Sequence, residues 1–400
     1  MRARALYLDP SQRRLGMALV AITLAAVTGS ARAAEPFEID AILSTTGPGA
    51  FIGAAEAQTL KVIEAQTNAA GGLRGRTIHF HVWDDQSNPQ VSVQIANQLI
   101  AARVAAFLGP TIPATCLAIQ PLVEKNGPLM YCLNPSIHPA SGSYAFSAGE
   151  DSADVAAVVL RYLKGRGLTR IASLHATDAS GADLARAFDA ALALPEMRSL
   201  SHVAQERFNP TDVSVSAQIA RIKAANAQAL LTWTAGTPLG TVLRGAHDGG
   251  LVIPIVTSGG NMNLAQVRQY ATFLPPELLF SAQIAWTPGN IGPGPIRDAQ
   301  RAYASAIRAA GFQPDAGYTI AWDPALVYLD AFRKLGVGAT AEQIRTYISG
   351  LRGWIGIDGV YDFRGIPQRG LDQNAAQVME WDPKTGDFVA VSKRGGQQLR

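Results

Sequence analysis

Residues 37–89 are FEIDAILSTTGPGAFIGAAEAQTLKVIEAQTNAAGGLRGRTIHFHVWDDQSNP, and this stretch decides the fold. The apolar runs at 37–43 and 77–83 predict two strands, and the amphipathic stretch 53–70, ended by Gly71-Gly72, predicts a helix between them. A strand, a helix and a second strand in this order form a parallel pair with a right-handed crossover. The stretch therefore predicts an α/β fold.

The same alternation continues along the chain. In the next segment, Val91, Ile95, Leu99 and Ala102 share one face of a helix that begins after Asn88. Helices are predicted at 89–103, 114–125, 154–164, 182–193, 213–224 and 238–247, and strands at 105–108, 129–133, 170–174, 200–204, 229–232 and 252–256.

The regular alternation of predicted strands and helices ends after residue 256. A Pro- and Gly-rich segment at 287–295 precedes helical patterns at 297–310, 317–335 and 341–349, and strands are predicted at 359–363 and 378–381. The chain is longer than one hydrophobic core usually organises. We therefore expect α/β architecture with two doubly wound lobes.

The N-terminus has the composition of a secretory signal. Arginines precede an apolar run at 15–27, and the small residues Ser30-Ala31-Arg32-Ala33-Ala34 follow it. We expect residues 1–33 to be a signal peptide that directs the protein to the periplasm, without a lipid anchor. Its removal takes five arginines and one aspartate, so the formal net charge changes from +3 to −1. A nearly neutral chain gives no argument for a nucleic-acid partner.

Motifs of catalysis are missing from the sequence. There is no G-x-S-x-G, H-E-x-x-H, C-x-x-C, Walker loop or G-x-G-x-x-G after a strand. His79 and His81 share a strand face without further ligands nearby, and we expect them to be exposed. We expect Asp84 and Asp85 to be solvated turn residues. The sequence thus predicts no enzyme, no metal and no cofactor.

Cys116 and Cys132 are the two cysteines of the chain. Export permits a disulfide between them, and both are predicted near one edge of a sheet. Two separate, small buried residues are the alternative.

Three loops follow the predicted strands of the first lobe, at 44–51, 109–115 and 134–136, and are rich in hydroxyls, Gly and Pro. Ligands of parallel sheets bind at the carboxyl ends of the strands, where helix N-termini suit a carboxylate. Capping and turn chemistry explains part of this composition as well.

Four short segments carry a family resemblance: Thr46-Gly47-Pro48, NAAGGLRGR at 68–76, DDQSNP at 84–89 and GPLM at 127–130. In this order and spacing the chain resembles the periplasmic Leu/Ile/Val-binding proteins, the type I solute-binding components of ABC importers. The resemblance implies two lobes that close on a central cleft by a hinge. It implies crossings near 147–149, 281–285 and 362–365, an N-terminal lobe of 34–148 plus 284–363, and a C-terminal lobe of 149–283 plus 364–400.

The resemblance also implies how a ligand is held. Family members bind the carboxylate of an amino acid by two hydroxyls and its ammonium by an acidic residue. Ser136 stands at one hydroxyl position. Pro113 stands at the other, so Thr111 or Thr115 would replace it. Gly259 stands at the acidic position, and a buried ammonium without an anionic partner is costly.

The aromatic positions depart from the family as well. Ser180 and Ala235 stand where the family often has tyrosine, whereas Phe51, Trp233 and Tyr318 could form apolar walls. A wider pocket without a partner for an ammonium favours an aromatic or branched organic acid over an amino acid or amide. The expected ligand contacts are Thr46, Phe51, Ile52, Thr111, Pro113, Ala114, Thr115, Asn134, Ser136, Ser180, Trp233, Ala235, Gly259, Asn261 and Tyr318.

The predicted function is capture of a small molecule and its delivery to a membrane permease by a monomeric protein. A ligand-sensing subunit of a signalling receptor is the alternative, because only the docking partner would differ. An exported enzyme would need a nucleophile with a base, and the sequence shows no such pair.

Overall fold

The computed structural model describes residues 35–234, 236–286 and 291–399. Residues 37–400 form one compact unit. The signal peptide expected at 1–33 lies outside the described residues. No helix in the described part of the chain is both long enough and apolar enough to span a membrane.

Five parallel strands form the first sheet, in the order β2-β1-β3-β4-β5. The strands are β1 (Phe37–Leu43), β2 (Ile78–Asp84), β3 (Ala106–Leu108), β4 (Leu129–Cys132) and β5 (Ala145–Ser147). The helices that connect them are α1 (Ala50–Ala69), α2 (Pro89–Ala101) and α3 (Pro113–Val123). Strands β3 and β4 are buried throughout, as expected for parallel strands with both faces covered.

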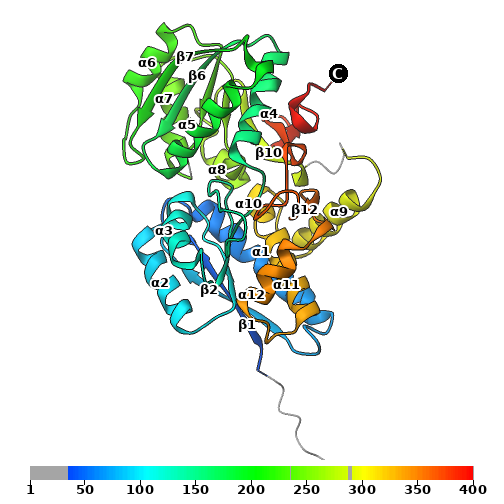
Figure 1. Cartoon of the computed structure of the whole chain (residues 1–400). Helices are drawn as coiled ribbons and strands as arrows, with labels where there is room; N and C mark the ends of the chain where they lie inside the picture. The colour runs from blue at the N-terminus through cyan, green and yellow to red at the C-terminus, as the bar shows by residue number, and fades with distance from the viewer. Residues whose placement is uncertain (1–34, 235, 287–290, 400) are drawn as a thin grey trace, which may run out of the picture. The chain divides into compact units, whose positions relative to one another are not determined.

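Helices from the last third of the chain return to the first sheet (Figure 1). Tyr303, Tyr328 and Ile344 from these helices join Ile39 and Leu108 in one buried core. The helices are α9 (Pro295–Ala309), α10 (Ala316–Thr319), α11 (Trp322–Leu335) and α12 (Ala341–Ser349), and the hairpin β11 (Arg352–Ile355) and β12 (Val360–Asp362) follows them.

Seven strands form the second sheet, in the order β14-β13-β10-β9-β8-β6-β7. Its parallel strands are β6 (Arg170–Ala176), β7 (Ser201–Phe208), β8 (Ala229–Thr232), β9 (Ile255–Thr257) and β10 (Leu278–Gln283), and β13 (Ala376–Asp382) and β14 (Asp387–Ala390) are antiparallel additions. The associated helices are α4 (Ser152–Gly165), α5 (Ala179–Leu192), α6 (Ser216–Ala224), α7 (Pro238–Asp248) and α8 (Leu264–Gln269). The chain is thus an α/β protein with two sheets that consist mainly of parallel strands, as predicted.

The single helix predicted at 317–335 is wrong, because α10 ends at Thr319 and α11 begins at Trp322. Pro324 has no N–H to continue a helix from α10, whereas it is tolerated in the first turn of a new one. The sequence pattern also did not indicate β5, β10, β11, β14 or α8. Strands β5 and β14 have only three and four residues, too few to show a period.

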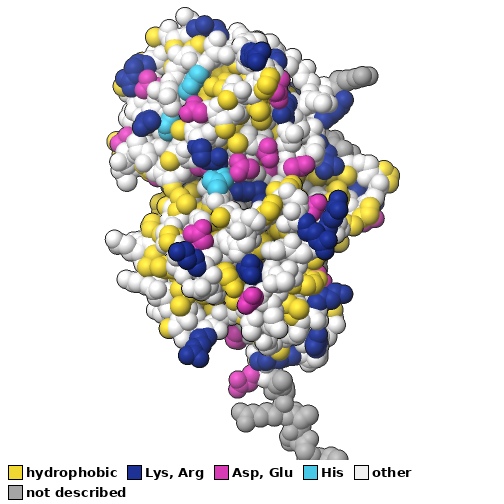
Figure 2. All heavy atoms as spheres, viewed as in Figure 1, with side chains coloured by type: hydrophobic (Ala, Val, Ile, Leu, Met, Phe, Trp, Pro, Cys, Tyr) yellow, Lys and Arg dark blue, Asp and Glu magenta, His cyan; other side chains and the backbone are white. Residues whose placement is uncertain are grey.

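Figure 2 shows basic and acidic side chains interspersed over one face of the molecule. His79 and His81 are exposed, as predicted.

Cys116 of α3 and Cys132 at the end of β4 form a disulfide, with their Cα atoms 5.9 Å apart. Both residues are fully buried. Of the two alternatives that the sequence left open, the bonded one is present. The bridge ties α3, which follows β3, to the neighbouring strand of the sheet.

We expect reduction of this disulfide to lower the free energy of unfolding by about 3 kcal/mol, since it closes a loop of 16 residues. Urea titration with and without dithiothreitol measures the change. The double variant C116S/C132S serves as the control, because its midpoint should not respond to the reductant. An unchanged wild-type midpoint would contradict a stabilising bridge.

Candidate ligand-binding site

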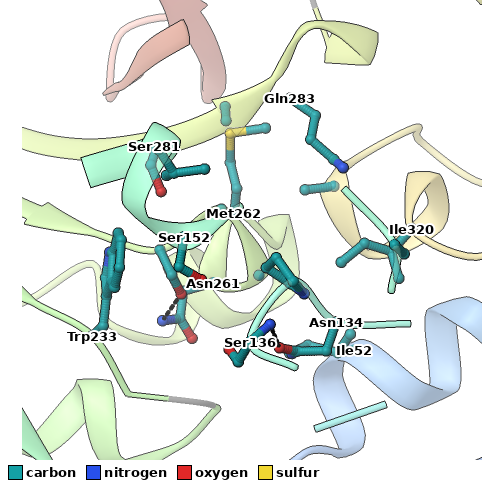
Figure 3. A pocket seen from close by; sticks show the side chains of 18 of the residues that line it. Ile52, Asn134, Ser136, Ser152, Trp233, Asn261, Met262, Ser281, Gln283 and Ile320 are labelled. Carbon is teal, nitrogen blue, oxygen red and sulfur yellow. Dashed lines mark hydrogen bonds between the residues drawn. The ribbon is translucent and has the colours of Figure 1, made fainter. Parts of the chain in front are cut away.

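A pocket lies at the carboxyl ends of strands from both sheets (Figure 3). The first sheet contributes residues that follow β3, β4 and β5, and the second contributes residues at the ends of β8, β9 and β10. Ligands of parallel sheets bind at this edge. The cavity has a volume of about 110 Å³ for the centres of water-sized molecules. That is room for a small organic molecule, on the order of ten non-hydrogen atoms.

The structure brings together most of the predicted contact residues. Those that line the pocket are Ile52, Thr111, Pro113, Asn134, Ser136, Ser180, Trp233, Gly259 and Asn261. Those that do not line it are Thr46, Phe51, Ala114, Thr115 and Tyr318. Ala235 lies outside the described residues. The ring of Tyr318 instead packs on Phe312, with centroids 5.4 Å apart, against the core of the first sheet.

The loop after β1 is held by the two aspartates at the end of β2. Asp85 is fully buried and accepts hydrogen bonds from Ser44 Oγ at 2.7 Å and Ser92 Oγ at 2.9 Å. Asp84 accepts a hydrogen bond from Thr46 Oγ1 at 2.7 Å, which occupies that hydroxyl away from the pocket. The expectation of solvated turn residues is therefore wrong for Asp85, because its carboxylate anchors the loop from inside.

Thr111 lines the pocket, but its hydroxyl is already engaged. Oγ1 accepts from Ser44 N at 3.0 Å and donates to Glu56 Oε2 at 2.5 Å. Burial raises the pKa of Glu56 to about 8. The other candidate, Thr115, donates its hydroxyl to the carbonyl of Ile112 at 3.0 Å. Neither threonine thus offers a free hydroxyl at the position where Pro113 departs from the family.

Ser136, in contrast, presents an unused hydroxyl. Its backbone N donates to Asn134 Oδ1 at 3.0 Å, and Asn134 Nδ2 donates to the carbonyl of Thr111 at 3.3 Å. This turn joins the loops after β3 and β4. Within the described residues no hydrogen bond involves Ser136 Oγ, so it can bind a ligand.

The second sheet contributes two buried donors without a partner. Trp233 Nε1 and Thr234 Oγ1 follow β8, line the pocket and make no hydrogen bond in the described part of the chain. A buried donor left unpaired costs about 1–3 kcal/mol. Both atoms therefore favour a ligand that brings an acceptor.

Asn261 has a structural role at the pocket. It belongs to η3 (Gly259–Asn261), and its Nδ2 donates to the carbonyl of Thr234 at 2.8 Å while its Oδ1 accepts from Gly236 N at 3.2 Å. These bonds connect the segments after β8 and β9. Glycine is required at position 259 for a steric reason, because a Cβ there would lie 2.3 Å from the carbonyl oxygen of Ser281. An acidic side chain at 259 is thus excluded by the neighbouring strand.

Two acidic residues that the sequence analysis missed line the pocket, Glu150 and Asp183. Asp183 Oδ2 accepts from Ser152 Oγ at 2.5 Å, and Oδ1 faces His138 Nε2 at 3.1 Å and Arg186 at 2.9 Å. No Lys or Arg occurs among the described lining residues. The signal that could have found Glu150 is its place directly after the crossing expected at 147–149.

Arg369 does not line the pocket but binds two segments that do. Its guanidinium, in a residue that is 6% exposed, donates to four backbone carbonyls at 2.7–3.2 Å. Two of these belong to Pro135 and Ile137, and two to Gly149 and Glu150. One cation thus joins the loop that carries Ser136 to the segment that carries Glu150.

Two mainly parallel sheets with a pocket at their carboxyl edges define an α/β ligand-binding protein. A family model described as "Periplasmic binding protein" matches residues 36–387, and the chain belongs to this family.

A curated relative, Leu/Ile/Val-binding protein homolog 3 of Brucella melitensis, is 25% identical over 61% of this chain and 67% of its own length. An extracellular ligand-binding receptor of Rhodopseudomonas palustris HaA2 has a similar structure, with a TM-score of 0.79, 18% identity and coverage of 89% and 99% of the two chains. So does an ABC-transporter solute-binding protein of R. palustris in complex with benzoate, with a TM-score of 0.75, 15% identity and coverage of 91% and 97%.

We expect Glu56→Gln to be more stable than wild type above pH 8, on the order of a few kcal/mol. The pKa of Glu56 is about 8 in the folded state, against 4.5 for a free glutamate. Because the folded state favours the protonated carboxyl, Glu56 contributes fully to the free energy of unfolding below pH 4.5. This contribution decreases as the pH rises and is lost above pH 8. Urea titrations at pH 4 and pH 9 measure the difference, which should vanish at pH 4. The exposed Glu38→Gln is the control, and equal behaviour of both variants would refute the assignment.

We expect Arg369→Met to lower the free energy of unfolding by about 3–5 kcal/mol, because four backbone carbonyls, three of them buried, lose their donor. Arg364→Met is the matched control, since the exposed side chain of Arg364 makes one hydrogen bond within the described residues, to the carbonyl of Gly350 at 2.8 Å. Thermal and urea unfolding compare the two variants. Similar losses in both would mean that the four carbonyls do not depend on Arg369.

Proposed function

We propose that the chain is the solute-binding component of an ABC importer and captures a small carboxylic acid in the periplasm without changing it chemically. The observation that carries this proposal is the pocket's set of free neutral groups that can donate hydrogen bonds: Ser136 Oγ, Trp233 Nε1 and Thr234 Oγ1. Helix α3 adds an N-terminus without a side-chain cap. Such groups stabilise an anion in a desolvated site without needing a basic side chain.

The apolar walls favour an aromatic or branched acid. Ile52, Trp233, Met262 and Ile320 surround the pocket (Figure 3). The benzoate complex of the R. palustris protein and the branched-chain amino acids named for the B. melitensis relative are both compact carboxylates with an apolar body. We favour the aromatic or branched acid because Gly259 cannot carry the carboxylate that the family uses for an ammonium, so an amino acid would have to place its ammonium against another acidic residue of the pocket.

Closure of two lobes, 34–148 plus 284–363 and 149–283 plus 364–400, would enclose the ligand. Segments near 147–149, 281–285 and 362–365 act as the hinge in this proposal. A ligand stabilises the closed form by the difference between its affinities for the closed and open states. A monomer in this closed form would then dock on a permease through the rims of its lobes.

Calorimetric titration of benzoate, phenylacetate, 4-methyl-2-oxopentanoate, leucine and phenylalanine tests the proposal. Trp233→Phe keeps the apolar wall and removes one donor, so we expect about tenfold weaker binding of the acid that binds best. Trp83→Phe is the matched control, because Trp83 Nε1 is bonded to Asp40 at 2.8 Å and does not line the pocket.

Failure of every acid to bind would refute the proposal, and so would equal affinities of the two tryptophan variants. Uptake of the labelled ligand by cells with and without the gene separates import from signalling.

A further inference from the structure

The proposed capture of a carboxylate leaves Glu150 without a role. This residue lines the pocket, is 2% exposed and lies between β5 and α4. A carboxylate removed from water to this extent normally has a cation or several donors as partners.

Glu150 has few partners for a buried acid. In the described part of the chain its carboxylate is hydrogen-bonded by its own backbone N–H and by Gln283 Nε2, the latter at a long 3.4 Å. The guanidinium of Arg369 binds the backbone carbonyl of Glu150, and its other bonds go to carbonyls as well. Both oxygens of Asp183, the other acid of the lining, are already engaged. Glu150 is therefore the lining acid with unused capacity to accept hydrogen bonds.

The position of Glu150 separates it from the donors of the pocket. Gln283, its side-chain partner, and Trp233 lie on different sides of the cavity (Figure 3). The indole donor of the pocket and the carboxylate bonded to Gln283 thus lie on different sides of the cavity. A ligand that complements both sides carries a carboxylate and a separate donor.

We propose that Glu150 contacts the ligand and selects carboxylic acids that also carry a hydrogen-bond donor, an ammonium or a hydroxyl. This inference rests on the proposed function for the carboxylate end of the ligand. It adds an anionic contact at a position other than 259, where the backbone of Ser281 excludes one. A donor on the ligand compensates the buried charge when water is excluded.

The ionisation of Glu150 gives the selection a pH dependence. Burial raises its pKa to about 7, Gln283 is hydrogen-bonded to its carboxylate, and the nearby charged groups that act on it electrostatically are Arg369, Asp154 and Asp358. The carboxylate form, which accepts from the ligand, increases as the pH rises through 7. Affinity for donor-bearing acids should therefore increase between pH 5.5 and 8.5, and affinity for donor-free acids should not.

The experiment uses two matched sets of acids with the full mature protein. Benzoate, 4-hydroxybenzoate and 4-(aminomethyl)benzoate place no donor, a hydroxyl or an ammonium opposite the carboxylate. The acids 3-phenylpropanoate, 3-phenyllactate and phenylalanine place them beside it. Calorimetry at pH 8 compares wild type with Glu150→Gln, and Glu38→Gln is an exposed control of the same charge change.

We expect a donor-bearing acid to bind wild type at least about tenfold more tightly than its donor-free counterpart. Glu150→Gln should remove this preference and its pH dependence, and it should not weaken the donor-free acid, because it removes a negative charge from the pocket. The variant should also unfold no earlier than wild type at pH 8, since it removes a buried charge. The member of each set that binds best distinguishes an ammonium from a hydroxyl and shows its position.

Two outcomes overturn the inference: donor-free acids that bind as tightly as their counterparts, or a Glu150→Gln variant that weakens all acids equally. If no acid of either set bound wild type, the proposed capture of carboxylic acids would be wrong instead.

Discussion

The arrangement of the pocket depends on one buried guanidinium. Arg369 donates to carbonyls of the loop after β4 and of the segment after β5, and these two segments carry Ser136 and Glu150. The cation is tolerated in the interior because four carbonyls and Asp151, at 3.8 Å, compensate its lost hydration. Arg369 therefore positions two side chains of the pocket without lining the pocket itself.

Much of the fold could be predicted because its signals are local. β1 and β8 have the predicted bounds, since each is a short apolar run between turn residues. α12 also matches, and Thr340 and Gln343 form a capping box at its start. β10 (LLFSAQ) is an apolar run as well and was not predicted, and what no such run could show is its place between β9 and β13. Strand order is a tertiary property, and no window of a few residues contains it.

The candidate site divides in the same way between local and tertiary signals. The loops after β3 and β4 were predictable, because parallel strands end at a common edge. Which side chains of these loops are available to a ligand could not be predicted from the sequence. The hydroxyl of Thr111 is engaged by Glu56, 55 residues earlier in the chain. Gly259 is required by the carbonyl of Ser281, and that contact exists only when β9 and β10 are neighbours. A loop composition rich in hydroxyls therefore predicts which edge of the sheet binds a ligand. Which of these hydroxyls are free to bind it becomes known only from the hydrogen bonds of the folded structure.

The unpaired groups also determine what kind of discrimination the pocket can achieve. Trp233 Nε1 and Thr234 Oγ1 have no partner in the described chain, so an apolar ligand of the right shape leaves both donors buried and unsatisfied. A site built around such groups rejects a molecule that lacks the matching acceptor far more strongly than it separates two acids that differ by a methylene, a difference of about 1–3 kcal/mol. Since no described lining residue is a lysine or arginine, the preference for an acid that we propose would come from fixed dipoles in a desolvated space. Fixed dipoles have a direction, and in the proposed complex the indole and hydroxyl donors would therefore set the orientation of the acid, with its body against the apolar walls.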